Sequence, residues 1–240
     1  MDMTKITMDE FEKGKQLTRS VIIPFGSVEE HGPHLPLGTD TMHALAIAMR
    51  TARQRPVFVA APVWYGLCRS SSQHPGTLTI KGSTLRSIAM DVISALYQQG
   101  LTNQIILSGH AGGTHMAFLV DAAEEAIDKL PMLKCAVISI IDLVNECCAE
   151  LVDTPGDSHA GEVETSLVQA IDPALVKGLA PEEYPDFPRY LISREKRIYW
   201  PGGVWGDPGK ASPEKGHRIL ELESKKIIEI LNSLEEKEVA

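Results

Sequence analysis

The sequence predicts an α/β fold in which helices cover both faces of a mostly parallel sheet. Short apolar runs rich in Val and Ile alternate along the chain with longer segments of helical periodicity. Buried strands that alternate with helices form parallel βαβ units, and these units place helices on both faces of the sheet. The 240 residues contain no internal repeat and no low-complexity linker. We therefore expect residues 1–240 to form a single domain.

Short apolar segments are expected to form the strands of this sheet. Each strand run is bounded by turn-forming residues, as buried strands usually are. The buried strands are predicted at residues 21–25, 57–63, 104–107 and 135–141, and a short edge strand is predicted at residues 77–80.

Longer segments with apolar residues at helical spacing predict the helices. In residues 83–99, for example, Leu85, Ile88, Val92 and Leu96 recur at this spacing. The other helices are predicted at residues 41–54, 114–129, 162–171 and 214–234, the last of them charged and amphipathic. Residues 65–76 and 172–213 are rich in turn formers and are expected to be irregular.

Composition and charge exclude several classes of function. Lys and Arg total 23 and Asp and Glu total 32, so the net charge of −9 argues against a nucleic-acid partner. No segment approaches the roughly 18 apolar residues of a membrane span, and the polar N-terminus lacks a signal-peptide core. The four cysteines, Cys68, Cys135, Cys147 and Cys148, show no Cys-x-x-Cys spacing and are expected to be reduced, buried thiols. We therefore expect a cytoplasmic protein.

The densest cluster of reactive side chains lies in residues 29–40. Two prolines and two glycines prevent a continuous helix here, so the segment is predicted to be a loop leaving the first strand. Open α/β sheets bind ligands at the carboxyl ends of their strands. Glu29 and His31 are two residues apart and face the same side of an extended segment, while Glu30 is expected to be a solvated neighbour. Asp40, at the start of the next helix, can return to the same point.

Two further clusters are expected at the same edge of the sheet. Residues 108–115 follow the third strand and contain His110, and residues 159–166 open a later helix with His159 and Glu164. Mixed His and carboxylate ligands suit Zn²⁺, Mn²⁺ or Fe²⁺ better than Ca²⁺. Each residue taken alone has an ordinary structural explanation, and the convergence of three clusters is what predicts a metal site.

At these residues the sequence resembles the creatininase (creatinine amidohydrolase) family. The opening signature of the family, Gly-Ser-x-Glu-x-His-Gly-Pro-His-Leu-Pro-x-x-x-Asp, is found at residues 26–40. Residues 74–77, 109–110, 159–166 and 203–208 also resemble segments of the family, in the same order, and the resemblance covers roughly residues 20–216. It implies a three-layer α/β/α sandwich, a two-metal centre and a homo-oligomer, often a hexamer.

The resemblance also implies a set of metal ligands. Glu29, Asp40 and His110 would hold one divalent ion, and His31 and Asp40 would hold the other, with the Asp40 carboxylate bridging the two. Creatininase has a Glu at the position of Gly112. Glu164, which matches an active-site Glu of the family, is therefore the expected replacement ligand of the second ion.

The activity implied is hydrolysis of a C–N amide bond in a small substrate, cyclic substrates included. Two Zn²⁺ ions are expected, with Mn²⁺ or Fe²⁺ as alternatives, and a metal of this kind lowers the pKa of its bound water. His159 would protonate the leaving nitrogen, with Glu164 as a second catalytic residue. Creatinine itself is disfavoured as the substrate, because the tryptophans that pack over it in creatininase have no counterpart before Trp200.

Two alternatives remain open at this point. The same metal centre suits a hydrolase that opens a cyclic, sugar-derived ketone. A metal-stabilised binding protein without catalysis is favoured by Gly112 but disfavoured by the presence of His159 and Glu164. The Trp- and Gly-rich segment 200–210 is predicted either to line the site or to form a subunit contact.

Overall fold

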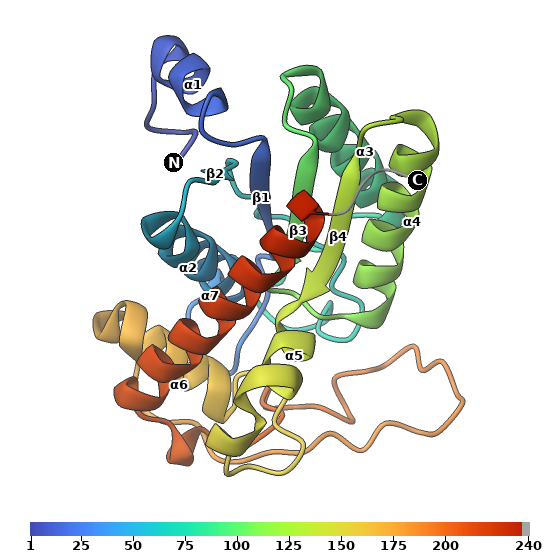
Figure 1. Cartoon of the computed structure of the whole chain (residues 1–240). Helices are drawn as coiled ribbons and strands as arrows, with labels where there is room; N and C mark the ends of the chain where they lie inside the picture. The colour runs from blue at the N-terminus through green and yellow to red at the C-terminus, as the bar shows by residue number, and fades with distance from the viewer. Residues whose placement is uncertain (237–240) are drawn as a thin grey trace.

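A computed structural model describes residues 1–236, in which four parallel strands form the central sheet (Figure 1). The strands are β1 Ser20–Phe25, β2 Phe58–Val59, β3 Asn103–Ser108 and β4 Lys134–Ser139, in the spatial order β2-β1-β3-β4. All three neighbouring pairs are parallel. The mostly parallel sheet predicted from the sequence is confirmed.

Helices connect the strands and extend beyond the sheet. They are α1 Met8–Lys15, α2 Thr39–Gln54, α3 Gly82–Gln98, α4 Gly113–Lys129, α5 Ile140–Leu143, α6 Glu162–Ile171 and α7 Pro213–Glu236. Short helical turns occupy Val144–Cys148, Ala149–Leu151, Pro173–Leu175 and Pro208–Lys210. Between α6 and α7 the chain forms a long loop, drawn in orange in Figure 1.

Strands β1, β2 and β3 are buried on both faces, which produces three layers. Ile23 and Ile106 belong to one hydrophobic cluster with residues of α3 and α4. Ile22 and Ile105, one position earlier, belong to a second cluster with residues of α2 and α7. Successive side chains of a strand point to opposite faces, so the two clusters lie on opposite sides of the sheet. The expected α/β/α sandwich is therefore confirmed.

The register of β1 and β3 brings two loops to one edge of the sheet. Phe25 pairs with Ser108, so the two strands end side by side. The turn after β3 lies directly against the start of α2, where a Cβ at Gly109 would be 1.8 Å from the carbonyl oxygen of Asp40. A residue without a side chain is required at this contact. The close approach fixes the loop that carries His110 relative to the helix that carries Asp40.

Several predicted boundaries were wrong, each for a local reason. The strand predicted at residues 57–63 is reduced to β2, after which the chain makes one further bridge, from Val63 to Phe25. Residues 77–80 form no strand; the N–H groups of Leu78 and Ile80 donate to carbonyl groups of neighbouring loops instead. The strand predicted at residues 135–141 ends at Ser139, whose side chain caps α5.

Helix α1 was not predicted, although the sequence contains its start signal. The N–H of Thr7 donates to the Glu10 carboxylate at 2.7 Å, and the Thr7 hydroxyl accepts from the Glu10 N–H at 3.4 Å. This reciprocal arrangement is a capping box. The Thr-x-x-Glu pattern at residues 7–10 is the signal that the hydrophobic periodicity alone does not reveal.

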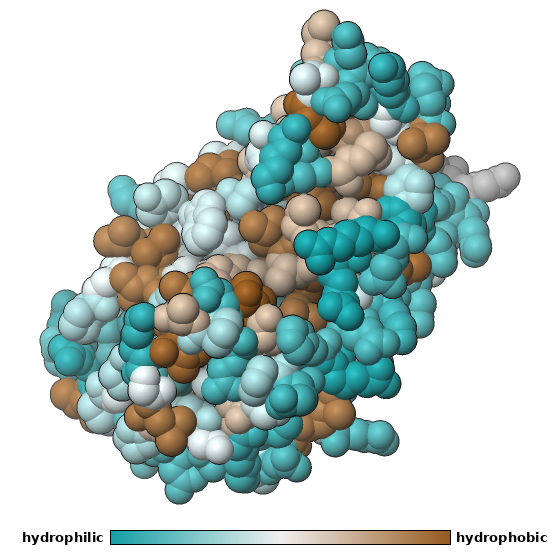
Figure 2. Space-filling view, turned by 90° about the vertical axis from the view of Figure 1, so that its left-hand side faces the viewer, coloured by the Kyte–Doolittle hydropathy of each residue, from teal (hydrophilic) through white to brown (hydrophobic). Residues whose placement is uncertain are grey.

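The surface of the described chain is mixed in polarity. Figure 2 shows that hydrophobic side chains on one face of the molecule occur in several small groups separated by polar side chains. Among residues 1–236, each helix is too short or too polar to cross a lipid bilayer.

A buried ion pair joins α2 to α7. The ring nitrogen Nε2 of His43 lies 2.9 Å from Oε2 of Glu223, and both side chains are almost fully buried. Burial acts to lower the pKa of His43, but the Glu223 carboxylate overrides this effect and raises the pKa above its ordinary value of 6.5. The folded state therefore binds the His43 proton more tightly than the unfolded state does.

We expect Glu223→Gln to destabilise the protein most at low pH. Because the folded pKa of His43 is raised, its stabilising effect is fully present below about pH 6.5 and is lost as pH rises through the folded pKa. Urea unfolding followed by circular dichroism should show a loss of about 1.5–3 kcal/mol near pH 6. The difference between variant and parent should shrink toward pH 9. Glu214→Gln, which changes an exposed carboxylate of α7, is the control; a pH-independent difference for Glu223→Gln would contradict the assignment.

Candidate metal centre

The carboxylate of Asp40 lies at the middle of the candidate site, in the first turn of α2. Its Oδ1 is 2.9 Å from Nε2 of His31, and its Oδ2 is 3.2 Å from Nδ1 of His110. The hydroxyl of Ser27 donates to Oδ2 at 2.6 Å. Asp40 is buried and each of its oxygens faces a different imidazole. In this arrangement each oxygen of Asp40 is directed at a different histidine, and each could contribute to a separate cation site.

Glu29, Cys68 and His110 form the first group of potential ligands. Their ligand atoms lie within 4.8 Å of one another, and Oε2 of Glu29 is 2.8 Å from Nδ1 of His110. Nε2 of His110 is 3.1 Å from the Leu67 carbonyl, which can only accept a hydrogen bond. The Nε2 atom therefore carries the hydrogen, and Nδ1 of the neutral ring presents its lone pair toward the carboxylates. Ser71 donates a short hydrogen bond to Glu29.

His31, His159 and Glu164 form the second group. Their ligand atoms also lie within 4.8 Å of one another. Nδ1 of His31 bonds the Glu29 carbonyl at 3.0 Å, which leaves Nε2 directed at Asp40 and at Oε2 of Glu164, 3.6 Å away. The rings of His31 and His159 stack with their centroids 4.2 Å apart. Glu164 reaches the group from the first turn of α6.

The pKa shifts in the site follow from this crowding of opposite charges. Burial acts to raise the pKa of Asp40, but His31 and His110 override it and hold the pKa well below its usual value. Burial also acts to raise the pKa of Glu29, but the charge of His110 outweighs burial and the pKa falls to about 2. The pKa values of His31 and His110 rise well above 6.5, because the carboxylates outweigh the cost of burial. Protons on these rings supply the positive charge that the buried carboxylates need.

The donor set fits divalent metal ions. Glu29, Asp40 and Glu164 are all at least nine-tenths buried, and carboxylates at this density require positive charge beside them. Imidazole nitrogens together with carboxylate oxygens are the ligands of zinc, manganese and iron. A cation at each group would take the place of the protons on His31 and His110.

His159 lies between the second group and the neighbouring loop. Its Nε2 is 2.7 Å from the Glu30 carbonyl, and its ring meets the Trp200 ring edge-on at 5.0 Å. Burial and the nearby His31 act to lower the pKa of His159, whereas the hydrogen bond to Glu30 and the Glu164 carboxylate raise it, and the net shift is upward. A raised pKa favours the protonated ring, the form that donates a proton.

A cavity of about 230 Å³ opens onto both groups. Its walls include Glu29, Asp40, His110, His159 and Glu164, together with the loop 109–113, Ile140, Ile141, Ser70, Ser158, Trp200 and Trp205. The segment 200–210 therefore contributes two tryptophans to the walls of this cavity, which is the first of the two roles predicted for it. The five polar side chains named first are all residues singled out from the sequence.

Gly112 lies against the ring of His110. A Cβ at this position would be 2.7 Å from Nε2 of His110, so a side chain there would force the ring to move. The structure brings Glu164 to within 3.6 Å of His31 from a different helix. The role of Glu164 as the replacement ligand stays a prediction, and its side chain is within reach of His31.

Other residues of the site were missed or misjudged from the sequence. Cys68 is the free, buried thiol that the sequence predicted, but its place beside Glu29 was not predicted; burial and that carboxylate raise its pKa. Ser27 donates to Asp40 and Ser71 donates to Glu29, and neither serine was predicted to be a site residue. Glu30 was predicted to be solvated, and this was wrong, since only 5% of its surface is exposed.

A family model and two relatives of known description match most of this chain. The creatininase family model, described as creatinine amidohydrolase, matches residues 4–231. A mycofactocin precursor peptide peptidase of Mycobacterium ulcerans is 30% identical over 221 residues, which cover 84% of this chain and 80% of that protein. The 3-dehydro-scyllo-inosose hydrolase of Thermotoga maritima is 28% identical, covering 85% of this chain and 69% of the relative.

A solved structure points the same way. The structure described as "Creatininase Mn" superposes with a TM-score of 0.88 at 25% sequence identity, covering 97% of each chain. The creatinine amidohydrolase of Pseudomonas putida is 27% identical over 221 residues, which cover 84% of each protein. The match of one family model to nearly the whole chain, with both the fold and the relatives in agreement, shows that this chain belongs to the creatininase family of hydrolases.

Proposed function

We propose that this hydrolase cleaves a C–N amide bond in a small substrate with the help of two divalent metal ions. The observation that carries the proposal is the buried Asp40 carboxylate, with one oxygen facing His31 and the other facing His110. In this proposal Glu29, Asp40 and His110 hold one ion, and His31, Asp40 and Glu164 hold the other. A cation in this position polarises a carbonyl group and makes water acidic enough to attack it at neutral pH.

Zinc is the metal we propose first. The thiol of Cys68 lies within 4.8 Å of the ligand atoms of Glu29 and His110, and sulfur close to a site favours zinc over the harder manganese ion. A solved relative is described as the manganese form of creatininase, so manganese is the second choice and iron the third.

The residues of this chain supply the remaining chemistry. His159 lines the cavity and is the group we propose to protonate the leaving nitrogen, while its Nε2 is held by the Glu30 carbonyl. Glu164 sits close enough to His159 and His31 to hold or relay a proton as well as to bind metal. Trp200 and Trp205 provide flat apolar walls for the substrate.

The cavity also restricts the substrate. A volume of about 230 Å³ admits a small molecule, and among the described residues that line it there is no Arg or Lys. A phosphate or carboxylate on the substrate would have no cationic side chain to meet there. We therefore propose an uncharged, compact substrate, cyclic ones included.

Ring opening of a sugar-derived ketone is the second candidate function. The similarity to a 3-dehydro-scyllo-inosose hydrolase supports it, since that relative is a hydrolase by name and is 28% identical. Incubating the metal-loaded protein with cyclic amides and with cyclic polyhydroxy ketones, followed by NMR of the products, separates the two. Turnover of neither class by protein with full metal content would favour a non-catalytic binding protein.

The proposal includes a cytoplasmic homo-oligomer, of which a hexamer is one form. All four cysteines are free, as expected in a reducing compartment. The long loop before α7 exposes apolar side chains, with Tyr190 93% and Ile192 99% exposed, which are suited to a contact between copies. Light scattering on the purified protein measures the number of subunits.

The number of metal ions bound per chain should depend on the residues of each group separately. Because Asp40 faces both groups, we expect Asp40→Asn to lose both ions, while Glu164→Gln should retain close to one of the two. Elemental analysis of protein purified without added metal or chelator provides the measurement. Asp9→Asn, an exposed carboxylate of α1, is the control. Equal metal content in Asp40→Asn and the parent would remove the basis of the proposal.

His159 should be needed for turnover and not for metal. We expect His159→Asn to lower kcat by roughly 10²–10⁴-fold, because a positioned general acid contributes about that much. Its metal content should equal that of the parent, and His217→Asn, which changes an exposed histidine of α7, should leave both quantities unchanged. If His159→Asn loses an ion, His159 is a ligand of the second group, which its closeness to His31 and Glu164 would explain.

A further inference from the structure

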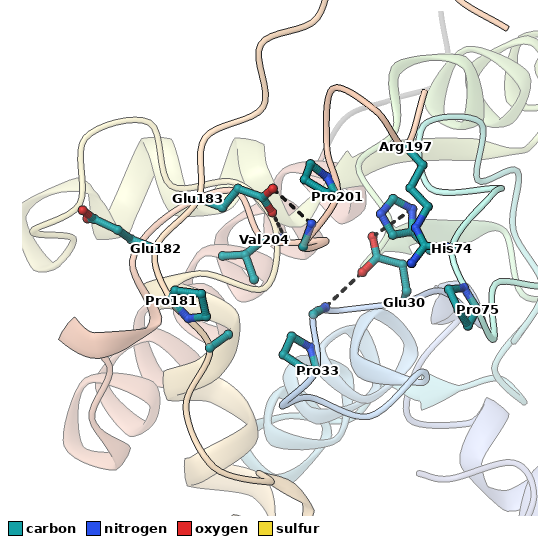
Figure 3. Close-up of a pocket in the computed structure, with 13 residues that line it drawn as sticks. Glu30, Pro33, His74, Pro75, Pro181, Glu182, Glu183, Arg197, Pro201 and Val204 are labelled. Carbon is teal, nitrogen blue, oxygen red and sulfur yellow. Dashed lines mark hydrogen bonds and ion pairs between the residues drawn. The ribbon is translucent and has the colours of Figure 1, made fainter. Parts of the chain in front are cut away.

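Two of the cavities outside the metal centre differ in the chemistry of their walls. The larger, of about 700 Å³, is drawn in Figure 3. The rings of His74 and His159 lie 3.8 and 3.6 Å from the same oxygen of its buried carboxylate, Glu30, which therefore has its partners within the protein. The other cavity, of about 470 Å³, is lined by two adjacent thiols, the half-buried Cys147 and the buried Cys148.

The backbone changes its helical type at these two cysteines. Helix α5 runs directly into a π-helical turn, Val144–Cys148, and a 3₁₀ turn, Ala149–Leu151, follows. Cys148, where the two turns meet, has φ −128° and ψ 1°, outside the α-helical region. The two Sγ atoms lie 3.6 Å apart, so the adjacent side chains present a pair of sulfurs. Single π turns of this kind are rare and are found frequently at functional sites.

The pair is suited to remain a dithiol. The Cα atoms of neighbouring residues are about 3.8 Å apart across a trans peptide bond, closer than the roughly 4.4–6.8 Å of ordinary disulfides. A bond between Cys147 and Cys148 would therefore require the turn to change its shape. Both cysteines are free in the structure.

The distance between the sulfurs restricts the geometry of a shared ligand. Two sulfurs bonded to one centre at about 2.3 Å lie roughly 3.1–3.8 Å apart when the bond angle is about 85–110°. A linear, two-coordinate ion such as Cu⁺ would need about 4.6 Å between them. The observed 3.6 Å therefore fits a pyramidal or tetrahedral centre.

The number of protein ligands restricts the choice further. Among residues 1–236, the groups of three or more His, Cys or carboxylate side chains that could hold one ion are the two groups of the metal centre. A zinc ion at the dithiol would have two protein ligands, whereas structural zinc sites have four. Trivalent arsenic forms three bonds and carries its own hydroxyl or organic group, so two thiols are enough for it.

The protonation of the thiols favours the same ligand. Burial raises the pKa of Cys147 and of Cys148, and the Glu223 carboxylate adds to this effect. A divalent cation must displace both protons into solvent, which a raised pKa opposes. The hydroxyl groups of an arsenical leave as water together with these protons, and the product has no charge to bury.

We propose that Cys147 and Cys148 form a binding site for trivalent arsenic, either inorganic or bearing one organic group. Each thiol exchanges its hydrogen for a bond to arsenic, and each of two arsenic hydroxyls leaves as water, so arsenic stays trivalent and sulfur is not oxidised. The third substituent of arsenic lies in the cavity, whose walls include Leu151 and Leu222. The described walls contain none of the proposed metal ligands, and the site does not depend on the proposed hydrolysis.

The dithiol is connected to the metal cavity through α5. Ile140 and Ile141, at the start of α5, line the metal cavity. The thiol of Cys147 donates to the carbonyl of Leu143, at the end of the same helix, at 3.0 Å. Arsenic bound to Cys147 takes the place of this hydrogen, so occupancy of the site acts on the helix that contributes to the metal cavity.

Titration of the metal-loaded full chain, followed by native mass spectrometry, tests the proposal with phenylarsine oxide as the probe. This probe condenses with two thiols and releases one water. We expect one phenylarsenic group per chain, removed by dithiothreitol and retained in the same concentration of a monothiol. Cys147→Ser and Cys148→Ser should each weaken binding by about 100-fold or more, because the second thiol acts at a high effective concentration. Cys135→Ser, which changes the partly buried thiol of β4, is the matched control and should bind like the parent.

Peptide mapping keeps the test decisive if the serine variants fold poorly. Digestion of the parent adduct with pepsin at low pH should place the arsenic on the peptide that contains residues 147 and 148. Arsenic found on the peptides of Cys68 or Cys135 would overturn the proposal, as would the absence of an adduct or full binding by both serine variants. The mass spectrum records bound arsenic and bound metal without turnover, so a failure of the proposed hydrolysis would be seen separately.

Discussion

The buried carboxylate of Asp40 constrains the geometry of the protein around it. It lies between His31 and His110, which come from different loops, and Ser27 donates to it from a third position. A buried carboxylate is stable only where donors or positive charges surround it. Meeting this requirement fixes the end of β1 beside the end of β3 and sets the start of α2 against Gly109, which leaves no space for a side chain there.

Most of the fold could be predicted because burial on both faces leaves a strong pattern in the sequence. The segments β1, β3, α3, α4 and α6 were located within one or two residues of their true ends. The errors lie where hydrogen bonds, and not hydrophobicity, decide the structure. Ser139 ends β4 by capping a helix, and the N–H groups of residues 78 and 80 find loop carbonyls in place of a strand partner.

The site residues that could be predicted are those that lie in sequence segments rich in histidine and carboxylate residues. Glu29, His31, Asp40, His110 and Glu164 come together as expected. Cys68 and Ser71 could not be placed, since they reach Glu29 from an irregular loop whose path is set by tertiary contacts. The same applies to the approach of Glu30 to His74, since the N–H of Glu30 donates to Thr77 of that same irregular loop region.

The proposed metal ligands are spread along the chain and are therefore synthesised at different times. During translation, Glu29 and Asp40 leave the ribosome well before His110, and Glu164 follows only after β4 and α5 have been made. The first group can therefore bind an ion once β3 pairs with β1, whereas the second must wait for α6 to dock. In the proposed two-metal site, uptake of metal would then follow folding in two stages, and each ion would stabilise the part of the chain already assembled.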